Sequence, residues 1–161
     1  MTVLVFVPVD RADAEALRAG ADLGARAGCA PTAALATYLG PDTVPEEVEF
    51  AALNHAGVVA LGVAADPLRL VLAADVADQQ LTDPGSQFGE VTVADLRWAQ
   101  VQAVFADEPA ARSAVAQARR ECAGRGLAEA LASEPVTTLQ SDFDLLWFAP
   151  EELDELGDDQ R

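Results

Sequence analysis

The chain is 161 residues long, a length that predicts one domain with a core large enough to fold without a metal ion or a disulfide. It carries 27 acidic and 10 basic residues, and its net charge of −17 opposes binding to nucleic acid and to anionic membranes. The same negative field favours a basic protein as partner. Lysine is absent, which excludes a phosphate-binding P-loop lysine and a Schiff-base lysine.

The first half of the chain predicts a buried strand followed by helices. Residues 3–7 are apolar throughout, as in a central strand covered on both faces. Start and stop signals predict a helix over residues 10–20. A longer helix is expected over residues 45–65, opened by a capping box of Thr43 and Glu46. Because it is apolar around nearly its whole circumference, we expect it to be the most buried helix.

The second half predicts two more strands and one long helix. Residues 68–74 are almost continuously apolar and predict a second central strand. Residues 98–106 alternate between apolar and polar, which predicts a strand nearer an edge and covered on one side. A helix is expected over residues 109–123, and residues 150–161 form a short acidic C-terminal segment. The expected fold is a single α/β domain over residues 1–161, with a mixed β-sheet packed by helices.

Four short segments occur in a characteristic order along the chain. They are Val5-Phe6-Val7-Pro8, residues 46–53, residues 71–76 and Leu145-Leu146-Trp147-Phe148-Ala149. Together they resemble a family of small acidic actinobacterial proteins of unknown function, and the resemblance covers nearly the whole chain. Because that family has no known activity, the resemblance assigns no role to any residue.

Three aspartates are the candidate catalytic residues, because Asp10, Asp75 and Asp107 each follow an apolar strand. If those strands are parallel neighbours, the carboxylates gather at one edge of the sheet, where open α/β sheets bind ligands. Such a cluster could hold Mg²⁺ together with water. A simpler interpretation makes Asp10 and Asp107 helix N-caps.

Three other patterns have both a functional and a structural interpretation. Arg112 and Arg119 are seven residues apart on one helix face, and are candidate anion ligands or part of a solvated face. His55, the only histidine, is either a catalytic base or a buried residue with a satisfied hydrogen bond. Asp142 and Asp144 form a D-x-D triplet, which suits a metal-dependent transferase or simply a solvated strand entry.

The remaining features concern compartment and partner. Cys29 and Cys122 match no zinc or redox spacing, so we expect reduced thiols, no metal and no cofactor. No signal peptide or membrane span is recognisable, which predicts a cytoplasmic protein. The segment 151–156 is either a docking element for a basic partner or a short helix packed back by Leu153 and Leu156.

These patterns favour a small acidic protein-binding or regulatory domain without catalytic activity. Two alternatives stay open. One is a carboxylate-based enzyme, with or without Mg²⁺, built from the aspartates. The other is an acidic decoy that imitates nucleic acid and occupies a basic protein surface. The sequence does not predict the oligomeric state.

Overall fold

A seven-stranded sheet with the strand order β4-β5-β2-β1-β3-β6-β7 organises the chain, and the computed structural model describes residues 1–159 of it. The strands are β1 (Thr2–Val9), β2 (Arg26–Cys29), β3 (Leu70–Ala77), β4 (Leu81–Thr82), β5 (Glu90–Val93), β6 (Val101–Ala106) and β7 (Leu146–Phe148). The α-helices are α1 (Arg11–Arg18), α2 (Ala33–Leu39), α3 (Pro45–Val63), α4 (Arg112–Cys122), α5 (Leu127–Leu131), α6 (Glu134–Asp142) and α7 (Leu153–Asp159). Short 3₁₀ turns η1 to η4 lie at Asp78–Gln80, Trp98–Gln100, Pro109–Ala111 and Pro150–Glu152.

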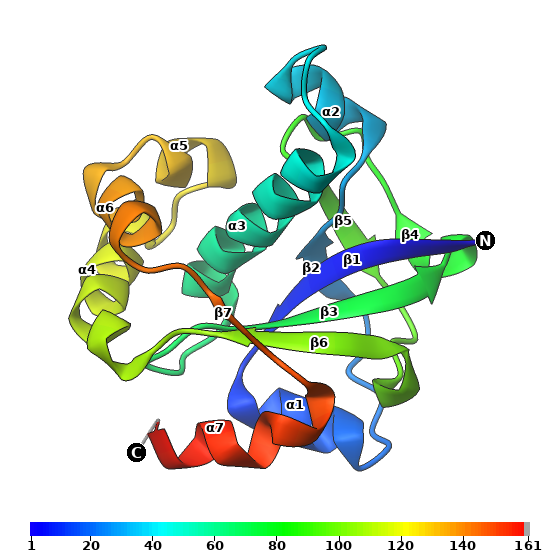
Figure 1. Ribbon diagram of the computed structural model, residues 1–161, viewed down its shortest axis with the longest axis vertical. Coiled ribbons are helices and arrows are strands. Elements are labelled where there is room, and N and C mark those ends of the chain that lie inside the picture. Colours follow the sequence, from blue (N-terminus) through cyan, green and yellow to red (C-terminus); the bar gives the residue numbers. More distant parts are fainter. Residues whose placement is uncertain (160–161) are drawn as a thin grey trace.

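Helices cover both faces of the sheet (Figure 1). Helix α3 lies over one face, and α1 and α7 lie over the other. Helices α4, α5 and α6 form a separate group against the C-terminal half of α3, with its own apolar cluster. No helix within residues 1–159 combines the length and the apolar content needed to cross a bilayer.

The predicted α/β class and both central strands are confirmed. Strands β1 and β3 are neighbours near the middle of the sheet, with Val9 opposite Leu70 and Thr2 opposite Ala77. The expectation of a mixed sheet is corrected, because every pair of neighbouring strands is antiparallel. A strand that is buried on both faces has the same apolar pattern in a parallel and in an antiparallel sheet, so the pattern could not reveal its direction.

The predicted strand over residues 98–106 is shorter than expected and is covered on both faces. Its first three residues form η2, and β6 begins at Val101. A β-bulge shifts the register between β3 and β6, so Ala103 pairs with Ala73 while Val101 pairs with Ala74. The bulge leaves Gln102 exposed, and buried residues of β6 belong to the clusters on both sides of the sheet.

Two of the expected helix starts differ in how they are capped. The side chain of Asp10 accepts a hydrogen bond from the backbone N–H of Asp13 at 2.8 Å and so caps α1, as expected. The capping box of Thr43 and Glu46 does not form, because Val44 is the N-cap residue of α3 and makes no side-chain cap bond. Pro45 at the start of the helix, with φ already in the helical range, fixes the first turn instead.

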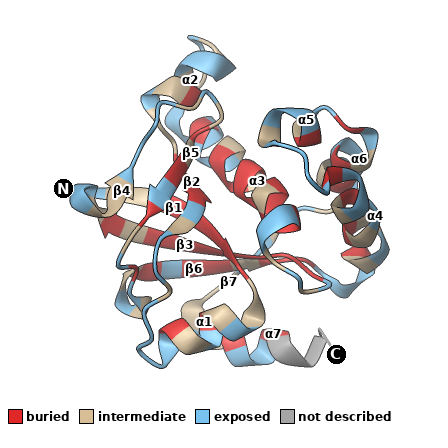
Figure 2. Cartoon of the chain, turned by 180° about the vertical axis from the view of Figure 1, so that it is seen from behind, coloured by how far each residue is buried: buried red, intermediate tan, exposed pale blue. Residues whose placement is uncertain are grey.

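Helix α3 is the longest helix and the one with the most buried residues, as its composition predicts (Figure 2). At its Gly57 an added side chain would be in tight contact with two neighbouring side chains. A Cβ atom there would be 3.0 Å from Nη1 of Arg69 and 3.1 Å from Cδ1 of Leu145. The glycine therefore lets the helix approach the sheet above the buried Arg69.

Replacing Gly57 with alanine should destabilise the protein by about 1–3 kcal/mol, because the added methyl group meets a guanidinium that is already fixed. Gly62 lies on the same helix, and a Cβ atom added there would have no neighbour within 4 Å. Gly62→Ala is the matched control and should be neutral or stabilising by up to about 1 kcal/mol. Thermal and urea unfolding of both variants measure the difference. Equal stability of the two variants would contradict the close approach at Gly57.

Candidate functional site

The three candidate aspartates do not come together. Asp10 and Asp107 lie at the same end of the sheet, because Val9 pairs with Leu70 and Leu70 pairs with Ala106. Asp75 lies further along β3, opposite Leu4, toward the other end. Within residues 1–159, no three His, Cys, Asp or Glu side chains are grouped so that they could hold one metal ion.

Asp107 has a role that the sequence analysis missed. It is not a helix N-cap, since Glu108 occupies that position before η3 and makes no side-chain cap bond. Its carboxylate is buried and accepts hydrogen bonds from Nε and Nη2 of Arg69 at 2.8 Å each, and from the backbone N–H of Arg69 at 2.9 Å. The signal in the sequence is Arg69 itself, a lone charge inside the apolar run from Leu68 to Ala74.

This buried pair is a structural element. The side chains of Arg69 and Asp107 are 2% and 0% exposed, so neither reaches a ligand at the surface. The bidentate contact and the additional backbone bond satisfy the carboxylate on both oxygens. Removing one partner would leave the other charge buried and uncompensated.

Asp107→Ala should therefore cost about 3–5 kcal/mol of unfolding free energy, the range found when one member of a buried ion pair is removed. Asp10→Ala removes only a helix cap and should cost about 1 kcal/mol. Glu108→Ala, at the exposed neighbouring position, is the control and should change stability by less than about 0.5 kcal/mol. Chemical denaturation gives all three values, and a loss for Asp107→Ala no larger than that for Asp10→Ala would contradict the structural role.

The two candidate arginines have different surroundings in the structure. Arg119 donates from Nε to the carbonyl oxygen of Leu61 at 3.3 Å, close to the C-terminus of α3. A cation at that position is favoured by the helix dipole. Arg112 is half-buried at the first position of α4, and Arg125 pairs with Glu121 at 3.3 Å.

His55 has the environment of a structural residue. It is 9% exposed, and its Nδ1 lies 2.8 Å from the carbonyl oxygen of Phe88, to which it donates a hydrogen bond. The ring of Phe88 meets His55 and Tyr38 edge-on, at centroid distances of 5.8 and 5.2 Å. The histidine thus links the loop before β5 to α3, and no carboxylate of the described residues forms a hydrogen bond with it.

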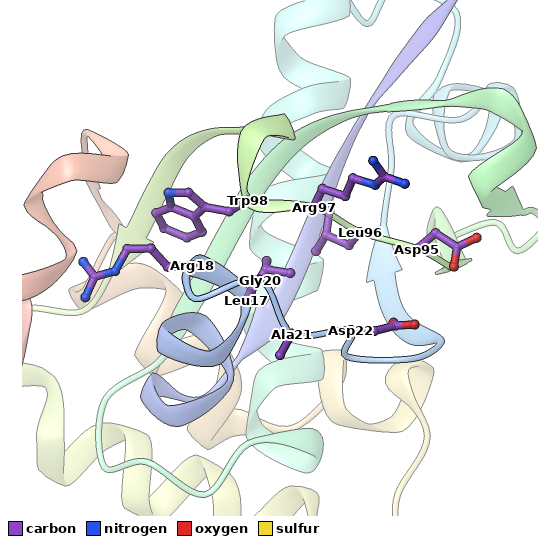
Figure 3. A pocket seen from close by; sticks show the side chains of 9 residues that line it. All are labelled: Leu17, Arg18, Gly20, Ala21, Asp22, Asp95, Leu96, Arg97 and Trp98. Atoms are coloured by element: carbon purple, nitrogen blue, oxygen red, sulfur yellow. The ribbon is translucent and has the colours of Figure 1, made fainter.

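An open pocket of about 510 Å³ lies between the end of α1 and the segment that leads into β6 (Figure 3). The indole of Trp98 and the side chain of Arg18 lie at one end of it, and the carboxylates of Asp22 and Asp95 lie at the other. Arg18 is engaged by Asp154 at 2.8 Å. Because both acidic and basic side chains line the pocket, it does not favour a ligand of either charge. None of the candidate site residues lines it.

The acidic C-terminal segment docks on the body of the protein. Leu153 and Leu156 are buried in the cluster beneath the sheet, at 0% and 5% exposure. Oε2 of Glu152 accepts a hydrogen bond from the backbone N–H of Ala149, and Asp154 binds Arg18. The hydrogen bond from Arg18 lowers the pKa of Asp154. Residues 160–161 of the segment lie outside the described part of the chain.

An exposed apolar pair lies just before that segment. Leu146 and Trp147 belong to β7, the last strand of the sheet, and are 42% and 61% exposed. The flanking carboxylates of Asp144 and Glu151 are also exposed. Asp142 is exposed as well, so both members of the D-x-D triplet lie at the surface ahead of this strand.

The fold and these positions define a small α/β protein with an antiparallel sheet, in which the three candidate aspartates do not meet in one site. A model of a family of unknown function, DUF6912, matches residues 3–156. The chain belongs to this family, which confirms the resemblance to a family of unknown function; an actinobacterial source stays a prediction. No curated protein and no solved structure matches the chain.

The two cysteines should differ in reactivity. Burial raises the pKa of Cys29 to about 12, and its side chain is 0% exposed. Burial also raises the pKa of Cys122, which is 6% exposed and lines a groove between α3 and the turn after α4. Because the thiolate is the reactive form, iodoacetamide at mildly alkaline pH should modify Cys122 slowly and Cys29 only after unfolding. Peptide mapping by mass spectrometry measures both, and faster labelling of Cys29 would contradict this order.

Proposed function

We propose that the protein is a non-catalytic protein-binding domain of the cytoplasm that recognises a basic partner through the β7 end of its sheet. The observation that carries the proposal is the pair Leu146 and Trp147, exposed on an edge strand within an acidic stretch. No arginine, lysine or histidine occurs between residues 126 and 156, while this stretch contains Asp142, Asp144, Glu151 and Glu155.

An exposed tryptophan surrounded by carboxylates suits a protein interface. Tryptophan is among the residues that contribute most to binding energy at interfaces. The surrounding negative field accelerates the approach of a basic partner and repels acidic ones. Support for the cytoplasm is the state of Cys29 and Cys122, which are both buried free thiols.

The two alternatives have less support. An enzyme built on Asp10, Asp75 and Asp107 needs these carboxylates in one site, but the first caps a helix, the second lies toward the other end of the sheet, and the third is buried against Arg69. A nucleic-acid decoy needs carboxylates arrayed at phosphate-like spacing on one exposed face, and the exposed Leu146 and Trp147 interrupt the acidic surface at the sheet edge. Nucleic acid itself is disfavoured by the net charge of −17.

The test is affinity capture from the native cytoplasm with three baits: the wild-type chain, Trp147→Ala and Phe50→Ala. Phe50 is 55% exposed on α3 and provides a matched control for the loss of a surface aromatic residue. We expect a basic protein that the wild-type chain and Phe50→Ala retain and that Trp147→Ala loses.

The captured protein is then purified and its binding to the wild-type chain is measured as the salt concentration is raised. The association rate should fall with salt, because the attraction between opposite charges is screened. The proposal is contradicted if no captured protein depends on Trp147, or if the binding does not respond to salt.

A further inference from the structure

Within residues 1–159, no strand pairs with the outer edge of β7. Strand β7 is last in the strand order and pairs with β6, with Phe148 opposite Val104, Trp147 opposite Phe105 and Leu146 opposite Ala106. Which of its backbone groups face outward follows from the hydrogen-bond pattern of the antiparallel sheet.

The backbone N–H of Asp107 donates to the carbonyl oxygen of Arg69 at 3.2 Å, and these residues are directly opposite in the β3–β6 register. Opposite pairs alternate along an antiparallel ladder, so the backbone groups of Phe105 also face β3. Those of Val104 and Ala106 then face β7.

The same alternation applies to β7. Leu146 and Phe148 exchange hydrogen bonds with β6, and the N–H and C=O of Trp147 point away from the sheet. The backbone N–H of Ala149 does not face β6 either, and instead donates to Oε2 of Glu152 at 3.1 Å. The outward-facing backbone donor and acceptor therefore belong to the residue whose side chain is 61% exposed.

The three-residue strand β7 lacks one device that edge strands use to avoid pairing. Such edges commonly place a charge on the strand itself, whereas the exposed side chains of β7 are those of leucine and tryptophan. The charges lie at its two ends, with Asp144 before the strand and Glu151 after it. Carboxylates at both ends oppose pairing with a second copy of this chain, which presents the same charges and a net charge of −17.

We propose that β7 is a strand-addition site for an extended segment of a basic partner. In this arrangement the segment forms a pair of backbone hydrogen bonds with Trp147 and places an apolar side chain beside the indole. Arginine or lysine residues three or four positions away on either side then reach Asp144 and Glu151. The inference rests on the proposed function and specifies how the partner binds.

The binding test uses a fluorescent synthetic peptide, Arg-Arg-Thr-Val-Val-Val-Thr-Arg-Arg, and fluorescence anisotropy. The wild-type chain and Phe50→Ala should bind it in a salt-sensitive manner. The same peptide with glutamate in place of arginine should not bind, and neither should the arginine peptide with an N-methylated central valine. Failure of the wild-type chain to bind the arginine peptide would overturn strand addition, and Trp147-dependent capture of a partner would still support the proposed function.

Two variants distinguish the contribution of the Trp147 side chain to peptide binding from that of its backbone N–H. Trp147→Ala removes only the indole and should weaken peptide binding several-fold. Trp147→Pro also removes the outward N–H, a change that an edge strand tolerates because no ladder bond is lost, and it should abolish binding. Equal binding by the two variants would overturn strand addition. It would mean that the peptide contacts only the side chain of Trp147.

Amide hydrogen exchange of the wild-type chain, followed by NMR, tests the geometry without any variant. In the free protein the amide of Trp147 should exchange faster than those of Leu146 and Phe148, and the peptide should slow it. Protection of the Trp147 amide in the free protein would overturn the proposal. If the Trp147 amide is protected only at high protein concentration, and sedimentation shows a dimer, the edge pairs with a second copy of the chain. That result would also overturn the proposal.

Discussion

The buried pair of Arg69 and Asp107 joins the elements that meet at one end of the sheet. Its bidentate contact spans the start of β3 and the residue that follows β6. The guanidinium lies beneath Gly57 of α3, and Leu145 approaches the same glycine. Desolvating two charges costs free energy that their attraction must offset, so the pair contributes through what it positions more than through its own strength. The pair therefore lies where α3 approaches the sheet, next to the residue that precedes β7.

Apolar residues before and after β7 hold this strand at the edge of the sheet, and its outer edge stays open. Leu145 packs into the cluster beneath α3, while Leu153 and Leu156 pack on the opposite face of the sheet. The residues between these anchors cross the sheet edge as a short strand. Leu145 is partly buried and Leu153 and Leu156 are buried, whereas Leu146 and Trp147 between them are exposed.

The candidate aspartates illustrate how strand direction decides which side chains come together. An aspartate after each of several strands suggests a ligand site only where parallel strands end together. In this antiparallel sheet the end of β1 meets the start of β3, so Asp10 lies near Arg69 while Asp75 lies toward the other end. Asp107 then pairs with the arginine that the sequence analysis did not single out. The sequence shows which residues are charged, but not which of them face each other.

Local physical chemistry explains what the sequence by itself determined. The continuous apolar runs of β1 and β3, the cap at Asp10 and the small, apolar composition of α3 each act within a few residues, and each was predictable. The tertiary structure alone decided the antiparallel direction of the sheet, the burial of Asp107 against Arg69 and the exposure of Trp147. These features depend on pairings between residues far apart in the chain, and an apolar strand has the same composition whichever neighbour it finds.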